Sequence, residues 1–454
     1  MEFLSFGMVI AASIALAVYA RVRCGSGNAR DFFVASGQLG GLLVFFLTIG
    51  ETYSIGSVLG FSTGVYLHGA AFAGWFMGYI LLSYPVGFVL APLLWQLGRR
   101  TGSITLADIF RAHFSSRLLE VVVAANAVAF LLPLGQMQFT GLISVMRSLH
   151  WHVTPAVLAG AGAGMTFGWV ALAGVRAPAY VSVLKDVLLV LAIMAAGSAA
   201  LLATGLPAAY VATPAPAVPA RQDMFVVSTI MLQSLGLCIT PQAVAFVFTA
   251  RSARMVRRNQ ILMPLYMLMF PFLYMIAEYV RRRGLAVPSA NDVFMLGVTT
   301  TLPPWMQGIV AGGCAVSALV ILAGVCLAIG PLVSRNMLHG LSDKGQRVGA
   351  QVVIGLYLLL CAAGAAGLGS IMVTLNNLYY LGMIQIAPGL LVALCGWRVP
   401  ALAIAAGLVA GGGLAVGLYL AGLMPGGINP GLIGLAVNAL IVATAGLRRP
   451  PCAR

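Results

Sequence analysis

Charged residues are scarce in this chain. Asp, Glu, Lys and Arg make up only 8% of its 454 residues, whereas 61% are hydrophobic and the mean hydropathy is +1.01. A soluble domain carries about 25% charged residues, which cover its water-facing surface. The composition therefore excludes a soluble enzyme, a nucleic-acid-binding module and a disordered protein. The apolar runs are long and unbroken, without the alternation of membrane β-strands, so we predict an all-α membrane protein with many spans.

The motifs of common enzymes and cofactor sites are lacking as well. The sequence holds no CxxC pair, no Cys/His spacing typical of a metal site, no phosphate-binding loop, no dinucleotide fingerprint and no nucleophile triad. We therefore expect no enzyme activity, no organic cofactor and no ATP-driven step. The seven cysteines are interpreted as small packing residues, since most of them lie inside apolar segments.

Apolar segments of about 20 residues, the length that crosses a membrane, occur thirteen times. They are residues 2–22, 39–65, 70–96, 118–146, 153–174, 178–204, 223–249, 259–282, 305–331, 347–365, 369–395, 399–423 and 429–446. If the N-terminus is outside, 20 of the 25 basic residues lie on the inner side and 5 on the outer side, as the positive-inside rule requires. We therefore predict thirteen spans with an outer N-terminus and an inner C-terminus, in the cytoplasmic membrane of the cell.

Two of these spans are interrupted by polar residues, glycine and proline. Residues 50–57 place Glu51, three Ser or Thr hydroxyls and two glycines near the middle of the second span, and residues 233–242 place Pro241 in the seventh. Unwound backbone at membrane depth is tolerated only where protein or a water-filled cavity satisfies it. The breaks are five spans apart, which is typical of transporters built from two inverted repeats of five helices. The alternative is that each break is only a packing kink.

This arrangement predicts five regions along the chain. They are an additional first helix with an inner loop (1–38), the first inverted repeat (39–204), an extracellular Pro/Ala loop (205–222), the second inverted repeat (223–395), and two additional helices with a short inner tail (396–454). Within the first repeat, Thr105 and Asp108 have the spacing of a helix cap, which predicts a short helix along the inner membrane face.

Ionisable residues at membrane depth usually mark an ion or substrate pathway. Glu51 could bind a cationic group, carry a coupling proton or form a structural hydrogen bond. Lys185, next to Asp186 early in the sixth span, either faces the interior as a fixed or switchable positive charge or extends to the inner interface. Glu278 is expected to form an interfacial ion pair with the arginines at 281–283.

Several blocks of the sequence resemble one known family. The resemblance is carried by residues 31–37 (DFFVASG) with Leu39 and Gly40, 56–61 (GSVLGF) with Gly64 and Tyr66, 105–114 (TLADIFRAHF), 174–177 (GVRA) and 315–317 (AVS). These blocks are similar to segments of the sodium:solute symporter family and extend over most of the chain. The resemblance implies a secondary transporter with a five-plus-five inverted-repeat core.

The resemblance also implies positions for a sodium site. Its backbone carbonyl ligands fall at Gly50, Tyr53 and Cys314, and its side-chain ligands fall at Ser317 and Ala318. Family members usually carry Ser or Thr at both of these last positions. Because the methyl group of Ala318 offers no hydroxyl ligand, the resemblance implies a weakened sodium site.

On the fifth core helix, the family's Asp falls at Ser182 and its Gln falls at Lys185. Proton-coupled and ion-independent carriers of this architecture can hold a lysine in the place of that sodium. Three alternatives therefore stand for the coupling ion: sodium at the weakened site, a proton handled by Glu51 or Lys185, or no ion.

We predict a symporter that moves a small polar organic solute by alternating access, with the solute bound between spans 2, 4, 7 and 11. The candidate contacts are Glu51, Thr52, Ser54, Gln136, Gln138, Gln233, Ser234 and Asn377. For each residue, an interhelical hydrogen bond is an equally good interpretation. The alternative from another class is a membrane solute sensor that works with a separate signalling partner. Besides the solute and membrane lipid no partner is predicted, and the sequence determines neither the substrate nor the oligomeric state.

Overall fold

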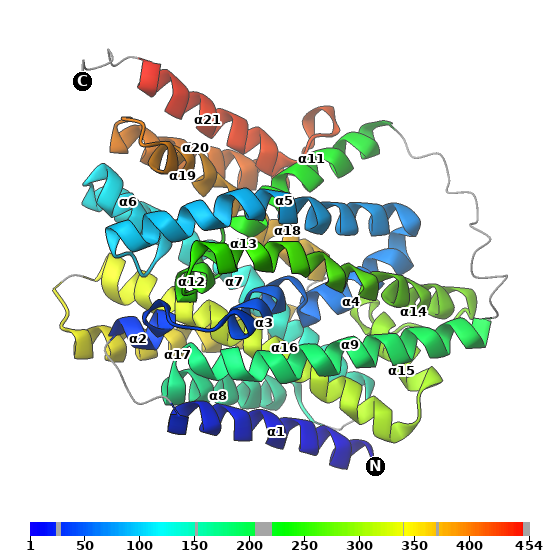
Figure 1. Ribbon diagram of the computed structural model, residues 1–454. Coiled ribbons are helices and arrows are strands. Elements are labelled where there is room, and N and C mark those ends of the chain that lie inside the picture. The colour runs from blue at the N-terminus through cyan, green and yellow to red at the C-terminus, as the bar shows by residue number, and fades with distance from the viewer. Residues whose placement is uncertain (24–28, 150–152, 205–219, 339, 369–371, 448–454) are drawn as a thin grey trace.

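The computed structural model describes residues 1–23, 29–149, 153–204, 220–338, 340–368 and 372–447, which form a bundle of long helices (Figure 1). The helices of the first half are α1 (Glu2–Arg23), α2 (Ala29–Val34), η1 (Ala35–Gly37), α3 (Gly41–Thr52), α4 (Ile55–His68), α5 (Ala70–Thr101), α6 (Leu106–Phe114), α7 (Arg117–Ser148), α8 (Pro155–Ala173) and α9 (Arg176–Thr204). Those of the second half are α11 (Ala220–Cys238), α12 (Pro241–Thr249), α13 (Ala253–Leu262), η2 (Met263–Met269), α14 (Phe270–Arg282), η3 (Ala290–Asp292), α15 (Val293–Thr301), α16 (Pro304–Pro331), η4 (Leu332–Met337), α17 (Asp343–Leu368), α18 (Met372–Met383), η5 (Ile384–Ile386), α19 (Ala387–Cys395), α20 (Ala401–Leu420), η6 (Pro425–Gly427) and α21 (Pro430–Leu447).

Each of the thirteen predicted spans corresponds to one helix or to two or three consecutive helical segments. Within the described residues, eleven helices are long and apolar enough to cross a membrane. The pair α11 and α12, bent by 41° at its break, would be a twelfth, and the apolar stretch of α21 (Pro430–Gly446) is shorter. The all-α membrane fold is therefore confirmed, while the number of spans and their orientation stay predictions. Residues 205–219 of the predicted Pro/Ala loop lie outside the described residues.

Helix α16 forms the centre of the bundle. Nearly all of its side chains are buried, because it packs against α1, α7, α8, α9 and α17. Its glycines permit this close packing: a Cβ on Gly312 would lie 2.8 Å from the Cβ of Val9, and a Cβ on Gly324 would lie 2.6 Å from the ring of Phe246. Small residues of this kind let membrane helices approach one another.

A polar network joins α6, α7 and η4 at one end of the bundle. Thr105 and Asp108 form the predicted capping box at the start of α6. Asp108 also accepts hydrogen bonds from Arg335 (3.2 Å) and from the amide of Asn336 (2.7 Å). The same amide donates to Glu120 of α7 at 2.9 Å. Three elements that are distant in sequence are thus connected through two carboxylates.

At the other end of α7, charged side chains are paired as well. Glu278 of α14 forms ion pairs of 2.7 Å with Arg281 and Arg282, which confirms the predicted ion pair. Ser144 of α7 donates a hydrogen bond of 2.5 Å to Asp292 of η3. Burial raises the pKa of Asp292 above that of an exposed aspartate, since a desolvated carboxylate is less stable than its protonated form.

Candidate functional site

The second predicted span is broken where the sequence analysis placed the break. Helix α3 ends at Thr52, and α4 begins at Ile55 after Ser54, whose extended backbone makes it an N-cap. The Ser54 hydroxyl accepts a hydrogen bond from the backbone N–H of Ser57 (3.2 Å), and the Ser57 hydroxyl donates to the carbonyl of Thr52 (2.5 Å). Short hydroxyl side chains therefore replace part of the lost helical hydrogen bonding.

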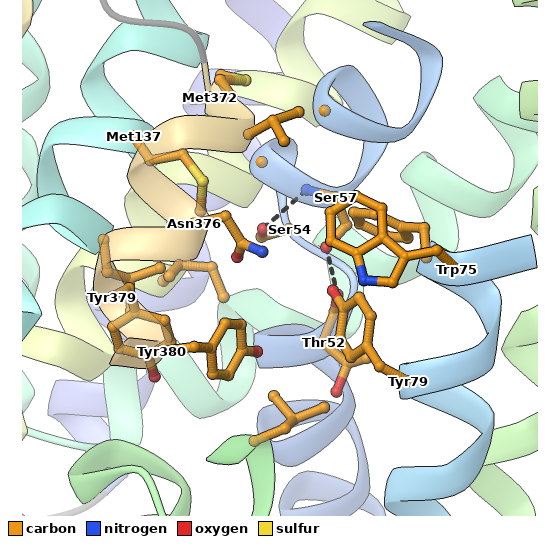
Figure 2. A pocket seen from close by; sticks show the side chains of 17 residues that line it. Thr52, Ser54, Ser57, Trp75, Tyr79, Met137, Met372, Asn376, Tyr379 and Tyr380 are labelled. Atoms are coloured by element: carbon orange, nitrogen blue, oxygen red, sulfur yellow. Dashed lines mark hydrogen bonds between the residues drawn. The ribbon is translucent and has the colours of Figure 1, made fainter. Parts of the chain in front are cut away.

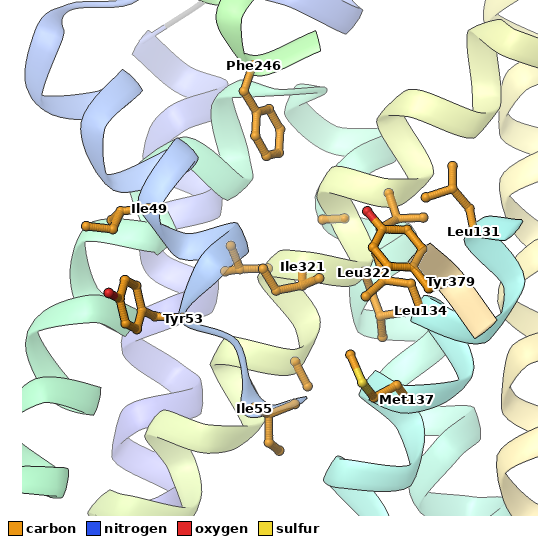
Figure 3. Close-up of a cluster of buried hydrophobic side chains, with 14 of the residues drawn as sticks. Ile49, Tyr53, Ile55, Leu131, Leu134, Met137, Phe246, Ile321, Leu322 and Tyr379 are labelled. Atoms are coloured by element: carbon orange, nitrogen blue, oxygen red, sulfur yellow. The ribbon is translucent and has the colours of Figure 1, made fainter. Parts of the chain in front are cut away.

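The apolar side chains beside the break are deeply buried. Ile49, Tyr53 and Ile55 flank it and belong to the same hydrophobic cluster as Ile321 and Leu322 of α16 (Figure 3). Carbonyl groups freed at the end of α3 are consequently removed from bulk water. They need partners from the protein, because an unsatisfied buried carbonyl costs free energy.

A cavity of about 590 Å³, counting its open part, lies next to this break (Figure 2). Its walls come from the α3–α4 break, α5, α7, α11, α16 and α18. The polar lining residues are Thr52, Ser54, Ser57, Trp75, Tyr79, Asn376, Tyr379 and Tyr380. Among the described lining residues, none carries a charged side chain.

Two hydrogen-bond donors on facing walls of this cavity lack acceptors. Figure 2 shows Trp75 of α5 on one side and Asn376 of α18 on the other. The indole Nε1 of Trp75 and the amide Nδ2 of Asn376 are buried and have no hydrogen-bond partner among the described residues. Most buried donors in proteins have an acceptor, so these two N–H groups are available to an acceptor that enters the cavity.

The N-terminus of α4 faces the same cavity. In its first turn, Ser54 supplies acceptors for the backbone N–H groups of Ser57 and Val58. The first N–H groups of a helix, here those of Ile55 and Gly56, have no acceptor within the helix. Gly56 lines the cavity, and a Cβ at this position would lie 2.6 Å from Cε of Met137. A side chain here would therefore require Met137 to move, where the helix end approaches the opposite wall.

Lys185 lies on the other side of the break. Its ammonium Nζ donates to the carbonyls of Gly50 (3.1 Å) and Tyr53 (3.2 Å) and forms an ion pair of 2.8 Å with Asp186. The side chains of Lys185 and Asp186 are fully buried. A Cβ on Gly50 would lie 2.9 Å from Nζ, so a larger residue would require the ammonium to shift. Of the two predicted orientations, the structure shows the interior one.

The wall contributed by α16 completes this position. Gly313 packs against Leu188 and Leu189 of α9. Gly308 lies against Glu2 and Gly312 lies against Val9, so α16 runs parallel to α1. Tyr19, near the end of α1, contacts Tyr180 at the start of α9, so α9 runs antiparallel to both helices. One turn beyond Gly313, therefore, Ser317 comes to the level of Lys185.

The side chains on this wall offer few ligands. Cys314, Ser317 and Ala318 are all buried. The Ser317 hydroxyl has no hydrogen-bond partner among the described residues, and the methyl group of Ala318 provides none. The ammonium of Lys185 is consequently the cation that the carbonyls of Gly50 and Tyr53 contact.

The other predicted contact residues are dispersed. Thr52 and Ser54 line the cavity, whereas Gln233 donates to Asn377 (3.0 Å) and Ser234 donates to a backbone carbonyl of its own helix, outside the cavity lining. Gln136 lies against Gly364 of α17, and Gln138 is buried with no partner among the described residues. The side chain of Glu51 lies outside the described part of the chain. For these residues a role in solute binding stays a prediction.

The sequence analysis did not select Trp75, Tyr79 or Met137, and it chose Asn377 rather than Asn376. One residue along a helix rotates the side chain by about 100°, so neighbouring asparagines face different surroundings. An aromatic cluster in the third span, around Trp75 and Phe76, was the only local signal for this wall.

The chain has membrane helices that are broken at two points five spans apart, and a cavity lies beside one break. These features are typical of secondary transporters. A model of the sodium:solute symporter family matches residues 32–337, or 306 of the 454 residues. The chain belongs to the sodium:solute symporter family. It is accordingly a multi-pass membrane symporter for a solute, as its sequence indicated.

Known proteins agree with this assignment. The "Monocarboxylate transport permease protein" of Rhizobium johnstonii is 27% identical over 333 residues, covering 69% of this chain and 67% of that protein. The uncharacterized symporter YhjB of Bacillus subtilis is 24% identical over 440 residues, 89% and 86% of the two chains. A solved Na⁺-coupled sialic acid symporter, in a substrate-bound outward-open state, shares the fold with a TM-score of 0.81 at 15% identity, over 99% of this chain and 98% of that one.

Family and fold support sodium-coupled solute transport as the general activity. The residues at the implied sodium position do not fit that ion in this structure. The carbonyls of Gly50 and Tyr53 already accept hydrogen bonds from Lys185, and Ala318 lacks a ligand atom. No mechanistic step is therefore assigned to sodium at this position.

Proposed function

We propose that this symporter carries a small monocarboxylate and binds it in the cavity beside the α3–α4 break. The observation that carries the proposal is the pair of buried donors without acceptors, Trp75 Nε1 and Asn376 Nδ2, on facing walls. A carboxylate presents only acceptors, so it can receive hydrogen bonds from both walls. The name of the R. johnstonii relative supports the same class of solute.

The rest of the cavity suits a short organic anion. The unpaired N–H groups at the start of α4 carry partial positive charge, and helix N-termini favour carboxylates for this reason. The lining residues that the structure describes include no acidic side chain that would repel the anion. Trp75, Phe76, Tyr79, Tyr379 and Tyr380 provide aromatic surface against which a short apolar tail can pack.

Transport would proceed by alternating access in the cytoplasmic membrane. The repeats proposed from the sequence, residues 39–204 and 223–395, each begin with a broken helix: α3–α4 in the first and α11–α12 in the second. Both breaks have the same construction, since Ser54 caps α4 and Thr240 caps α12 through side-chain hydrogen bonds. This similarity supports equivalent roles for the two broken helices, at which short segments can change direction while the longer helices remain intact.

The test is solute exchange by the purified full-length protein in vesicles. Wild-type protein should exchange labelled propionate for unlabelled propionate, lactate or pyruvate, and not for propionamide, which has the same size without the charge. Failure to exchange any monocarboxylate would exclude the proposed substrate class.

The residue-level test is Trp75→Phe, which removes the N–H group and keeps an aromatic ring. A hydrogen bond to a charged group contributes about 1.5–3 kcal/mol, so KM for exchange should rise about tenfold or more. Trp169→Phe is the matched control, because Trp169 of α8 is also buried, its Nε1 has no partner among the described residues, and it is not one of the lining residues. Equal KM values for the two variants would contradict the assigned role of Trp75.

A further inference from the structure

The buried ammonium of Lys185 has the surroundings of a bound cation. Three oxygens contact Nζ: the carbonyls of Gly50 and Tyr53 at 3.1 and 3.2 Å, and Oδ1 of Asp186 at 2.8 Å. Two of these oxygens belong to the break in the first core helix and the third belongs to α9. The charge therefore holds the broken helix against α9, as a free cation would do at the same place.

A second cation at these carbonyls would contact the ammonium directly. At such a distance inside a buried site, the repulsion between two positive charges is strong. Of the two side chains implied on the α16 wall, only Ser317 offers a hydroxyl, since Ala318 has none. The position therefore holds one cation, and that cation is the ammonium group of Lys185.

We propose that the proton carried by the Lys185 ammonium is the ion that this symporter couples to its solute. The inference rests on the proposed function, because the solute is taken to be a monocarboxylate anion in the adjacent cavity. The two positions share one segment: Lys185 contacts Gly50 and Tyr53, while Thr52 and Ser54 line the cavity. The ammonium and the solute position are therefore connected through the backbone of one broken segment.

The proton step balances without any further reactant. When water reaches Nζ in one open state, an N–H bond of the ammonium breaks, the proton passes to water, and the electron pair stays on nitrogen as a neutral amine. The Asp186 carboxylate then loses its partner, and the carbonyls lose a charged donor. Reprotonation from water in the state open to the other side restores the ammonium. One proton moves with one carboxylate anion, so transport is electroneutral.

Few other titratable groups face this position. Asp186 is the ion-pair partner, and Tyr266 of η2 lies within electrostatic reach of Asp186. The Tyr53 hydroxyl is hydrogen bonded to the Tyr84 hydroxyl at 2.7 Å, and Cys314 is buried on α16. Among the described residues packed around it, Lys185 is therefore the one cationic group at this level; the neighbouring Glu51 has no described side chain.

The experiment uses purified full-length protein in vesicles loaded with a pH-sensitive dye. In wild type, an inward proton gradient of one pH unit should drive uptake of labelled propionate without sodium, at an initial rate well above that of protein-free vesicles, into which undissociated propionic acid also diffuses. Above that background, the dye should record one proton per propionate, and replacing potassium by sodium should change nothing. In Lys185→Gln the gradient should give only the rate of protein-free vesicles. Lys344→Gln, at the exposed start of α17, replaces the chain's other lysine and should behave as wild type.

Two outcomes would overturn the inference. One is accumulation by wild type that requires a sodium gradient, and the other is full proton-driven accumulation by Lys185→Gln. If that variant does not fold, the proton-to-propionate ratio of wild type still decides. Propionate exchange without any ion gradient depends on solute binding alone, so its absence would refute the proposed function. Exchange that occurs without proton coupling would refute only this inference.

Discussion

At the scale of single residues, Gly50 shows how one missing side chain shapes the site. Its carbonyl accepts from Lys185, and its α-carbon lies so close to Nζ that a Cβ would be 2.9 Å away. The same Cβ would lie 3.9 Å from Asp186. Gly50 lies within the helical turns of α3, so glycine is not needed here for an unusual backbone conformation. Its role is to let the ammonium group approach closely.

We expect Gly50→Ala to lower stability, because the added methyl group displaces the ammonium from its carbonyls. Overpacking of a buried site costs about 1–3 kcal/mol, and the melting temperature in detergent should fall accordingly. Gly74→Ala is the control, since a Cβ at Gly74 of α5 meets nothing within 4 Å and alanine favours the helix. Equal melting temperatures for the two variants would show that Lys185 tolerates the methyl group.

For two neighbouring residues in one helix, the sequence could not show which one faces the cavity. Asn376 faces the cavity while Asn377 accepts from Gln233, although both are amides in the same apolar helix. The local sequence identified the helix but not its rotation, which depends on packing against α7, α11 and α20. The sequence could not identify Trp75 for the same reason. The cavity that its indole N–H faces is formed only when the helices pack together.

At the scale of elements, carboxylates hold short helices to long ones. Asp108 caps α6 and also accepts from Asn336 of η4, which in turn donates to Glu120 of α7. The cap was predictable, since Thr105 and Asp108 are three residues apart. The link to η4, 228 residues further along the chain, was not, because it depends on tertiary contact alone.

Asp108→Asn should destabilise this end of the bundle. The charge that holds Arg335 is lost, and the amide cannot reproduce every acceptor of the carboxylate. Loss of a charged hydrogen bond costs about 1–3 kcal/mol, so the melting temperature should decrease. Asp343→Asn, on the exposed first turn of α17, should leave it unchanged. A loss of similar size in both variants would indicate a general effect of acid removal.

At the scale of the whole molecule, the distribution of arginine predicts how the bundle lies in the membrane. An outer N-terminus and thirteen spans place the end of the eleventh span inside, where Cys395 is exposed after α19. The loop between α14 and η3, which contains Ala286, is then outside. Neither assignment depends on the fold, since the same bundle could be inserted in either direction.

Thiol labelling in intact cells tests this orientation. A membrane-impermeant maleimide should react with Ala286→Cys from outside, in a background from which the other cysteines have been removed. The same background retaining only Cys395 should react only after the membrane is permeabilised. The reverse pattern would show an inner N-terminus, and labelling of both positions from outside would show that the number of spans is not thirteen.

The sequence by itself determined the membrane class, the family, the two broken spans and the cap of α6. These follow from composition and from local rules, because span length, helix breakers and capping residues act within a few neighbouring residues. Only the tertiary structure decided that Lys185 contacts the carbonyls of Gly50 and Tyr53 instead of reaching the interface. It also decided that Trp75 and Asn376 face one cavity, because such contacts join helices whose rotation is set by packing between distant segments.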